Sequence, residues 1–567
     1  MKNTKNEGWW LIKLGLTIVG IKGLNEMTRA SKDGEKTLAK TLKRILTVSK
    51  DTAYGKEHHF SEIIKAKTPQ EMFRLYRENV PINDYEDMRP YVERHKNGEA
   101  GVLIPGKPKM YSTTSGTTRE PKWIPVSEMY YKQVYKTMNQ IWFYAMMKSR
   151  PDVYSGSSLS IVGKAIEGKA PDGTICGSIS GVIQRDVPYF MKKTYSAPHE
   201  AFYINDYKAR YYSLIRMALS RNITIIVTAN PSTLVEMQAN VNEHFNDYCN
   251  DIENGTISEK YFVADEIRTS VKSYLKPDPQ RAAELRKLKE CYGTILPKHY
   301  WPNMQIVTCW FSGNTKIYFD RIRDSYPSEC LFHEFGYIST ECKAGVVIKS
   351  NSRETVVFGH KNYIELVHES DLENPNPKIY QINEVEEGQR YFMLITTCSG
   401  LYRYNTNDLV KITGFYNSFP CIEFIQKING IVSLTGEKLH EQQFIEAVHE
   451  TEKKTGKIAP FFVGFCDPQK SSYKFYYEFA DQNISVTEAE EFTKYLDRCL
   501  QEFNPEYRDK RASNRLKPPD TALLCPESFE RFKAVCIDQG YRDGQFKVNL
   551  LMQDEKRHAI FKELIKK

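Results

Sequence analysis

The sequence of 567 residues lacks the patterns that mark several large classes of protein. Its twelve cysteines are scattered from Cys176 to Cys536, and no two of them form a C-x-x-C pair. This spacing excludes the common zinc-finger patterns. In a chain of this length it favours reduced thiols in the cytoplasm over a disulfide framework. There is also no internal repeat and no low-complexity tract.

An excess of charge of one sign is also missing. The 79 Lys and Arg residues nearly cancel the 71 Asp and Glu residues, which leaves a net charge of +8. Because no arginine-rich stripe accompanies this mild excess, we expect no nucleic-acid partner. The charge is compatible with an anionic small-molecule substrate.

No apolar run is long enough to span a bilayer, which takes about 20 residues. The apolar stretch Trp9–Ile21 is short and is interrupted by Lys13 and Thr17. Lys13 and the lack of a small-x-small cleavage site argue against a signal peptide. We expect a helix that packs on the domain, and no stable membrane association. A helix lying on a membrane surface with its two Trp residues inserted is the alternative that the pattern leaves open.

The most unusual stretch is Tyr111–Ser127, which reads YSTTSGTTREPKWIPVS. Thr113–Thr118 are six small residues in succession, five of them with hydroxyls, and Lys122 follows shortly after. Such a stretch suits a loop around a polyphosphate: Gly116 permits close approach of the backbone, the hydroxyls donate hydrogen bonds, and Lys122 supplies a positive charge. There is no G-x-x-x-x-G-K-[ST], so the loop is not a P-loop. A plain Ser/Thr-rich surface loop is the alternative.

Three further motifs contain side chains suited to a nucleotide. Gly336–Glu341 (GYISTE) combines an aromatic ring that can stack on adenine, hydroxyls that can reach phosphates and a carboxylate that can hold Mg²⁺. In Gly400–Gly414, Asp408 lies in a predicted polar turn, where it can accept hydrogen bonds from both ribose hydroxyls. Near the C-terminus, Arg542–Lys547 (RDGQFK) can present Lys547 as a cation. The alternatives are a strand-end turn, a hairpin turn that favours Asn-Asp and an exposed turn lysine, respectively.

The apolar pattern predicts an α/β protein of two domains. Four stretches read as strands: Ser158–Gly163, Ile223–Ala229, Val356–Val367 and Arg390–Thr397. The first two alternate with helices, which indicates a layered α/β domain, whereas the last two predict a mostly antiparallel sheet. Lys32–Ser49 reads as an amphipathic surface helix. Beyond Gly430 the order strand, strand, helix predicts a small α+β domain, so we expect domains over residues 1–427 and 428–567.

In this order the four motifs resemble those of the adenylate-forming, firefly luciferase-like enzymes. More closely, they are similar to the auxin-responsive Gretchen Hagen (GH3) family of acyl-acid amido synthetases. The resemblance rests on the SGTT loop with PKWIPVS, on Tyr337–Glu341, Gly400–Asn417 and Glu423–Glu441, and on GQFK at Gly544–Lys547. It runs from about Leu38 to Leu550, which leaves the Trp-rich N-terminus uncovered.

The sequence departs from the family pattern at three places. Arg119 and Glu120 stand where members usually carry glycine before the lysine, and Asn407 stands where a glycine usually precedes the aspartate. After GQFK, Val548 and Asn549 replace the usual Pro-Arg. No group that the chemistry needs is lost, but substrate choice and the detailed geometry of the loop are affected.

The resemblance implies an α/β (α+β) fold. A large N-terminal adenylate-forming-type domain with mixed sheets and flanking helices precedes a small mobile α+β C-terminal domain. It implies that ATP, with Mg²⁺, activates a carboxylic acid as an acyl-adenylate, which an amino acid then attacks. A carboxylate–CoA ligase and a catalytically silent nucleotide-binding scaffold are the alternatives. We expect a monomeric cytoplasmic enzyme.

The family's functional residues can be carried over one by one. The positions for the phosphates are Thr114, Ser115, Gly116, Thr117 and Thr118 in the first loop, with Ser339 and Thr340 in the second motif. Tyr337 corresponds to the residue that contacts adenine, Glu341 to the Mg²⁺ ligand and Asp408 to the residue that binds ribose. Lys547 corresponds to the lysine that acts on the α-phosphate or the carboxylate during adenylation. Glu341 and Lys547 are the candidate catalytic residues.

Overall fold

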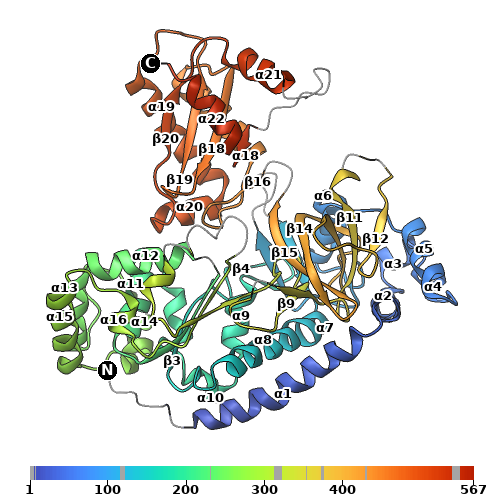
Figure 1. The fold of residues 1–567 in the computed structure, drawn as a ribbon, viewed down its shortest axis with the longest axis horizontal. Helices are drawn as coiled ribbons and strands as arrows, with labels where there is room; N and C mark the ends of the chain where they lie inside the picture. The colour runs from blue at the N-terminus through green and yellow to red at the C-terminus, as the bar shows by residue number, and fades with distance from the viewer. Residues whose placement is uncertain are drawn as a thin grey trace. The chain divides into compact units, whose positions relative to one another are not determined.

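The computed structural model describes residue 6 and residues 8–114, 122–229, 231–311, 319, 322–352, 354–371, 374, 376–427, 431–538, 550–553 and 555–566. The chain divides into two compact units, one of Met1–Thr114 with Lys122–Gln426 and one that contains Lys427–Lys567 (Figure 1). Each unit has hydrophobic cores of its own, and each is described by itself.

The first unit begins with six helices: α1 (Trp9–Ala30), α2 (Gly34–Ser49), α3 (Ala53–Glu57), α4 (Phe60–Ile63), α5 (Pro69–Asn79) and α6 (Tyr85–Lys96). Local sequence sets where several of them start. The side chain of Asp33 accepts a hydrogen bond from the backbone of Lys36 at the start of α2, and Thr68 precedes Pro69 at the start of α5. The predicted helix over Lys32–Ser49 is thus confirmed.

The first unit has two hydrophobic cores, and a parallel sheet of four strands lies at the centre of one of them. Its order is β3 (Ser157–Ile161), β6 (Ile223–Thr228), β7 (Ile306–Cys309) and β8 (Leu331–Glu334). β6 is buried along nearly its whole length, as expected for a strand covered on both faces. Between β3 and β8 the chain forms the helices α9 (Ile179–Asp186), α10 (Tyr189–Lys192), η2 (His199–Tyr203), α11 (Tyr207–Leu219), α12 (Ser232–Glu243), α13 (Phe245–Asn254), α14 (Asp265–Val271), η3 (Lys272–Tyr274), α15 (Pro279–Tyr292), α16 (Pro297–Tyr300) and η5 (Arg323–Ser325).

An antiparallel sheet of seven strands forms another part of the unit. The sequence predicts such a sheet, but the predicted strand Val356–Val367 is wrong, because the structure divides it into two strands, Thr355–Val357 and Tyr363–His368, that are not neighbours in the sheet. Its spatial order is β12 (Ile379–Gln381), β11 (Tyr363–His368), β13 (Arg390–Thr396), β14 (Tyr404–Tyr416), β15 (Phe419–Lys427), β10 (Thr355–Val357) and β9 (Gly345–Val347). The short helix η6 (Glu369–Asp371) follows β11. Because β8 and β9 are close in sequence but belong to different sheets, the segment between them connects the two sheets.

A smaller mixed sheet has the order β2 (Lys122–Val126), β1 (Met110–Thr114), β5 (Ile175–Cys176) and β4 (Gly168–Lys169). After β2 the chain continues as one long helical segment, made of α7 (Glu128–Tyr130), the π-helical turn η1 (Tyr131–Tyr135) and α8 (Lys136–Ser149). π-Helical turns are rare and occur frequently at functional sites, which directs attention to this segment.

The second unit is a small α+β domain. Its sheet has the order β20 (Asp520–Leu523), β19 (Ser472–Glu478), β18 (Phe461–Asp467) and β21 (Leu551–Met552), and β16 (Ile431–Val432) pairs with β17 (Leu439–His440). The helices are α18 (Glu441–Thr455), α19 (Val486–Phe503), α20 (Pro505–Ala512), α21 (Ser528–Asp538) and α22 (Glu555–Glu563). Both this α+β organisation and the mixed sheets of the first unit agree with the predicted fold class.

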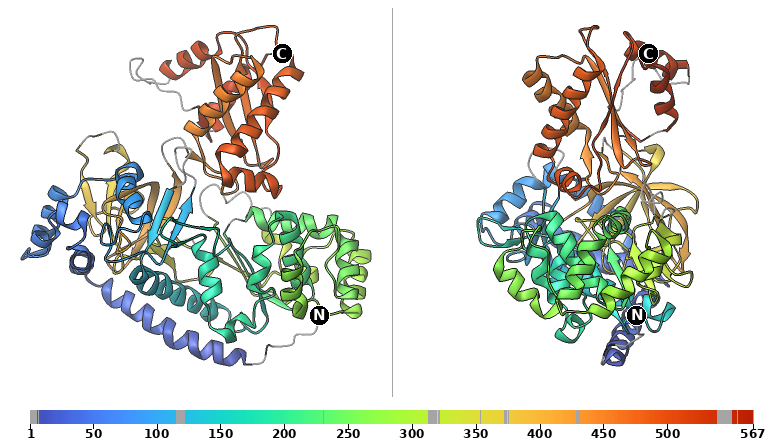
Figure 2. Two further views of the ribbon diagram at one scale, coloured as in Figure 1. Left: turned by 180° about the vertical axis from the view of Figure 1, so that it is seen from behind. Right: turned by 90° about the vertical axis from the view of Figure 1, so that its left-hand side faces the viewer.

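The predicted N-terminal helix packs on the first unit. Figure 2 shows α1 running along the edge of the unit beside α8, and the two helices are in contact over much of their length. Among the described residues, no helix is both long enough and apolar enough to cross a membrane.

Candidate functional site

The second and third motifs meet at one hydrogen bond. Tyr337 lies in the segment between β8 and β9, and Asp408 lies in β14. The hydroxyl of Tyr337 donates to Oδ2 of Asp408, although the two residues are 71 positions apart in sequence. Both side chains are buried. The fold therefore brings together two motifs that the sequence could only place in order.

The pair is a phenol donating to a carboxylate. Burial, and then the negative charge of Asp408, raise the pKa of Tyr337 well above its usual value, so the hydroxyl keeps its proton at neutral pH. A charge-assisted hydrogen bond of this kind holds the carboxylate in one orientation.

The backbone conformation at position 336, just before Tyr337, explains why the motif has a glycine there. Gly336 has a φ of +83°, which side chains other than glycine rarely adopt. A Cβ atom built there would lie 2.7 Å from the carbonyl oxygen of Gly345 in β9. Gly336 therefore lets the chain pass close to β9 and directs Tyr337 into the interior.

A tight turn follows Tyr337. Ile338 and Lys343 form an antiparallel bridge, the backbone N–H of Ser339 donates to the carbonyl of Cys342 at 2.8 Å, and the N–H of Cys342 donates to Oγ of Ser339 at 3.2 Å. Thr340 and Glu341 are thus the central residues of the turn. Ser339 and Thr340 are partly exposed, which suits hydroxyls that have to reach a ligand.

Glu341 is 8% exposed, and its negative charge contributes to raising the pKa values of Tyr404 and Tyr135. Burial, with a smaller contribution from the Glu341 carboxylate, raises the pKa of Tyr404 well above its usual value. No group of three or more His, Cys, Asp or Glu side chains in the described ranges could hold a metal ion by itself. A magnesium ion here would need phosphate oxygens as further ligands, as is usual for Mg²⁺.

Asp408 does not lie in a turn, so both the predicted polar turn and the alternative of a hairpin turn are wrong. It lies within β14, where the pairing with β13 shifts register between Phe392 and Leu394. At this bulge the hydroxyl of Thr406 donates to the carbonyl of Met393 at 3.0 Å, and the backbone N–H of Asp408 donates to Thr406 Oγ1 at 3.3 Å. Bulges re-aim side chains in a sheet and are common at functional sites.

Asn407, where the family usually has glycine, adopts a backbone conformation that is typical of glycine. Its φ is +56°, in the left-handed region that glycine favours and asparagine tolerates better than most residues. Its backbone N–H donates to Oδ1 of Asn405 at 2.9 Å. The departure of the sequence from the family pattern thus leaves the backbone shape before Asp408 possible.

The first motif is described only at its two ends. β1 and β2 form an antiparallel pair in which Thr114 is opposite Lys122. The predicted phosphate-binding residues Ser115, Gly116, Thr117 and Thr118 lie outside the described residues, as does Lys547. The backbone N–H of Trp123 donates to the hydroxyl of Tyr85 at 2.6 Å, so helix α6 contacts the start of β2.

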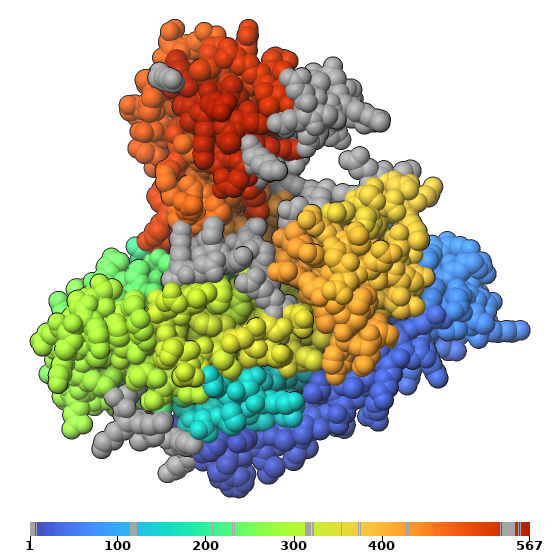
Figure 3. Space-filling model, viewed as in Figure 1, coloured from blue at the N-terminus to red at the C-terminus, as the bar shows by residue number. Residues whose placement is uncertain are grey.

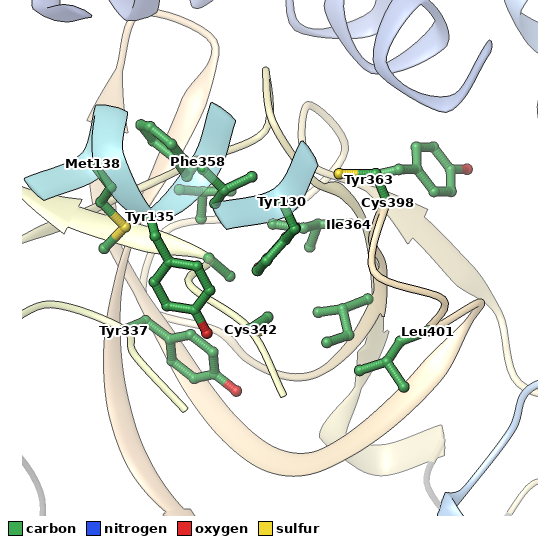
Figure 4. Close-up of a cluster of buried hydrophobic side chains, with 14 of the residues drawn as sticks. Tyr130, Tyr135, Met138, Tyr337, Cys342, Phe358, Tyr363, Ile364, Cys398 and Leu401 are labelled. Carbon is green, nitrogen blue, oxygen red and sulfur yellow. The ribbon is translucent and has the colours of Figure 1, made fainter. Parts of the chain in front are cut away.

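The sequence did not identify the aromatic cluster next to Tyr337. Figure 4 shows Tyr130 and Tyr135, from the helical segment after β2, in one buried cluster with Tyr337 and Cys342. The rings of Tyr130 and Tyr135 meet edge to face at 5.2 Å, and the hydroxyl of Tyr130 accepts from the backbone N–H of Lys343 at 3.0 Å. The aromatic residues of this segment belong to the hydrophobic core, and the π-helical turn left no recognisable signal in the sequence.

Lys343 is the other residue that sequence reasoning missed. It is 5% exposed, its ammonium group donates to Oδ1 of Asn139 at 2.7 Å, and it lies 5.0 Å from the ring of Tyr135. Burial lowers the pKa of Lys343 to about 7. Its position two residues after the GYISTE motif was the one available signal.

Comparisons with known proteins cover nearly the whole chain. Models of the GH3 family N-terminal, central and C-terminal domains match residues 23–331, 355–427 and 442–556. Indole-3-acetic acid-amido synthetase GH3.4 of Arabidopsis thaliana is 23% identical over 555 residues, which is 93% of this chain and 91% of that protein. Jasmonoyl–L-amino acid synthetase JAR4 of Nicotiana attenuata is 25% identical over 455 residues, 76% of this chain and 75% of that protein.

The fold is also shared with a solved structure. The structure of the AtGH3.15 acyl acid amido synthetase in complex with 2,4-DB matches with a TM-score of 0.64 and 19% identity, and the match covers 96% of each chain. Three family models match in the expected order, and the first alone covers more than half of the sequence. The protein belongs to the GH3 family of acyl acid amido synthetases, as the motifs predict.

Proposed function

We propose that this protein joins an acyl acid to an amino acid in two half-reactions that use ATP. The observation that carries the proposal is the hydrogen bond between Tyr337 and Asp408, because it unites two nucleotide-type motifs at one place in a GH3 family protein. By their names, the two relatives described above act on indole-3-acetic acid and form jasmonoyl–amino acid conjugates, respectively. By analogy we infer a small organic acid with a carboxylate as the acyl substrate.

The first half-reaction makes the carboxylate reactive. A carboxylate oxygen attacks the α-phosphorus of ATP, the bond to the bridging oxygen breaks, and pyrophosphate leaves. The product is an acyl-adenylate, in which AMP is a good leaving group. In the second half-reaction the amine of the amino acid attacks the acyl carbon, AMP departs with the bonding electrons, and the amine loses a proton to form the amide.

The described residues have defined tasks in this proposal. Asp408, oriented by Tyr337, accepts hydrogen bonds from the ribose hydroxyls, and the ring of Tyr337 contacts the adenine. The hydroxyls of Ser339 and Thr340 reach phosphate oxygens from the turn. Their partial exposure, next to the buried Tyr337, supports this division of labour.

Glu341 is the proposed ligand of Mg²⁺. A single buried carboxylate at the centre of a turn fits an ion that takes its remaining ligands from phosphates and water. When bound, Mg²⁺ would neutralise negative charge on the phosphates. We assign Thr114–Thr118 to the phosphates and Lys547 to the α-phosphate or the carboxylate during adenylation. Of these, residues 115–118 and Lys547 lie outside the described residues.

We further propose that the reaction takes place in the cytoplasm and that the protein acts as a monomer with a small mobile domain over residues 428–567. The cysteines whose surroundings the structure describes are free thiols. This supports a reducing compartment.

The test is a pyrophosphate-release screen of carboxylic acids crossed with amino acids, with the products identified by mass spectrometry. We expect release that depends on one class of acid and an amide product that depends on one class of amino acid. A parallel reaction with CoA instead of the amino acid separates the proposal from a carboxylate–CoA ligase. The absence of acid-dependent release with every acid would indicate a nucleotide-binding scaffold instead.

The wild-type screen needs two variants. Asp408→Asn removes the proposed ribose ligand, whereas Asp324→Asn changes a highly exposed aspartate of the same unit. We expect release to fall in Asp408→Asn and to stay at the wild-type level in Asp324→Asn. Equal activity of all three proteins would contradict the assignment of Asp408.

A further inference from the structure

Helix α1 has two different faces. Toward α8 it buries Ile12, Leu16 and Met27, together with Gly20 and Gly23. A Cβ atom on Gly20 would lie 2.2 Å from Cβ of Tyr144 in α8, so the two helices approach as closely as their backbones allow. This contact fixes the rotation of α1, and therefore also which residues it presents outward.

The outward face of the first half of α1 is apolar. Its large residues are Trp10, Leu11, Leu14, Ile18 and Ile21, with exposed fractions of 58%, 50%, 53%, 61% and 39%. These positions follow helical spacing and cover about 16 Å of helix at 1.5 Å per residue. Figure 3 shows α1 in dark blue at the surface, along the edge of its unit. A contiguous exposed patch of this kind marks an interaction surface.

The charge of the protein is concentrated in the same part of the chain. Residues 1–50 contain eleven Lys and Arg and four Asp and Glu, a net charge of +7 out of +8 for the whole sequence. In α2, Lys36, Lys40 and Lys43 are exposed and lie on one face at i, i+4 and i+7. The other 517 residues are thus nearly neutral.

We propose that α1, together with the basic face of α2, binds reversibly to the surface of an anionic lipid membrane. Trp and aliphatic side chains partition into the interface between headgroups and acyl chains, and nearby lysines are attracted to anionic headgroups. Lys13 does not oppose this arrangement, because its ammonium lies 5.5 Å from the ring of Trp9 and its long stem can reach the headgroups. From the sequence alone, packing and membrane contact are alternatives, whereas the two faces of α1 accommodate both.

The charge favours a lipid surface over a second copy of the chain. Two copies that met through this patch would bring together two regions of net charge +7, which repel each other. An anionic membrane is complementary in both respects, since it offers an apolar layer and negative charge. The binding is peripheral, because α1 is held on α8 by its opposite face.

The experiment is co-sedimentation of the full-length protein with phosphatidylcholine vesicles, with and without phosphatidylserine, at low and high salt. Four variants accompany the wild type. Leu14→Ser with Ile18→Ser removes apolar area from the outward face, and Lys36→Gln with Lys40→Gln and Lys43→Gln removes charge. Phe262→Ser is the matched control, because Phe262 is an exposed hydrophobic residue far along the chain at 81% exposure. Trp10→Ala tests the aromatic anchor.

We expect binding to the phosphatidylserine vesicles at low salt, weaker binding at high salt, and at least roughly ten-fold weaker partitioning of the Leu14/Ile18 variant. The lysine variant should bind more weakly and lose most of the salt dependence. Phe262→Ser should bind as the wild type does. Because the changed residues point away from the core, we expect each variant to keep its fold, and thermal unfolding of each variant measures this.

Two results would overturn the proposal. One is the absence of binding to phosphatidylserine vesicles at low salt, or binding that the Leu14/Ile18 variant retains in full. The other is self-association of the wild type, measured by sedimentation velocity without lipid and abolished in the same variant, which would assign the patch to a second copy. If the changes unfold the chain, brominated-lipid quenching of wild-type tryptophan fluorescence gives the same decision, and no quenching would refute the proposal.

Discussion

Each unit of the protein contains a buried tyrosine that donates a hydrogen bond to a buried carboxylate. One such pair in the first unit is Tyr337 with Asp408, and one in the second unit is Tyr473 with Glu437. Glu437 also accepts from the backbone N–H groups of Leu434 and Thr435, both at 2.7 Å, and from the hydroxyl of Thr435 at 3.0 Å. Most of its partners therefore come from its own loop.

The two pairs differ in where the hydrogen-bond donors to the carboxylate come from, and this difference distinguishes a structural carboxylate from one that binds a ligand. A buried carboxylate is stable only when hydrogen-bond donors compensate for its lost hydration. Three of the four donors named for Glu437 lie within three residues of it, so it closes the loop before β17 and has no need of a ligand. Asp408 lies at a strand bulge and faces a tyrosine from another motif. We interpret the first pair as a fastening of the loop and the second as part of the nucleotide site.

The largest effect is expected from a residue of the second unit that would contribute to chemistry. Lys547→Ala should slow adenylation by a factor on the order of 10²–10³, because one positive charge at the α-phosphate is lost. Aminolysis of a chemically prepared acyl-adenylate should be affected far less. Both half-reactions are measured on the same preparation, with the exposed Lys562→Ala as a control. Equal losses in both half-reactions would mean that Lys547 has no special role in adenylation.

Next in size is the loss of the structural carboxylate. Glu437→Gln replaces an acceptor of four hydrogen bonds with a group that presents an NH₂ to some of the same donors. Unfolding in urea should show a loss of about 3 kcal/mol, while ATP affinity stays close to that of the wild type. The exposed Glu502→Gln should leave both quantities unchanged. A large loss of ATP affinity without a loss of stability would reverse our interpretation of the two pairs.

A smaller effect is expected at the other carboxylate. Asp408→Asn keeps the shape and an acceptor for Tyr337 but removes the charge that would face the ribose. ATP should bind less tightly by about 2 kcal/mol, or roughly thirty-fold, because hydrogen bonds to charged groups are the stronger ones. Isothermal titration of ATP measures this change. Unaltered affinity would remove Asp408 from the ribose site.

The sequence predicted much of the fold, and there are physical reasons why it did not predict the remainder. Periodicity located α2 and several strands of the two large sheets, among them β3, β6 and β13, because apolar spacing depends only on which face is buried. The family and fold class followed from motifs in order, and the comparisons confirm them. The bulge at Asn407 was not predictable, since a turn and a bulge both interrupt an apolar strand with polar residues.

The sequence also could not predict which side chains are buried by segments that are distant in sequence. Nothing in the letters around Lys343 shows that it is buried beside Tyr135, because that contact depends on how two distant segments pack. The same holds for α1, whose apolar residues predict packing equally well for both faces until α8 is in place. The sequence thus predicts which groups the chemistry needs, but it does not show which of them the fold brings into contact.

The smallest expected effect decides how Tyr337 acts. Tyr337→Phe keeps the aromatic ring but removes the hydroxyl that orients Asp408. If the ring alone contacts adenine, ATP affinity should not change. If the hydroxyl positions Asp408 for the ribose, affinity should fall by about 1 kcal/mol, or roughly five-fold. We expect the second result. Titration with a nucleotide that lacks both ribose hydroxyls provides the matched control, because the penalty of Tyr337→Phe should disappear when Asp408 has nothing to bind. A penalty of equal size with both nucleotides would show that the hydroxyl supports the fold around the site and does not position Asp408.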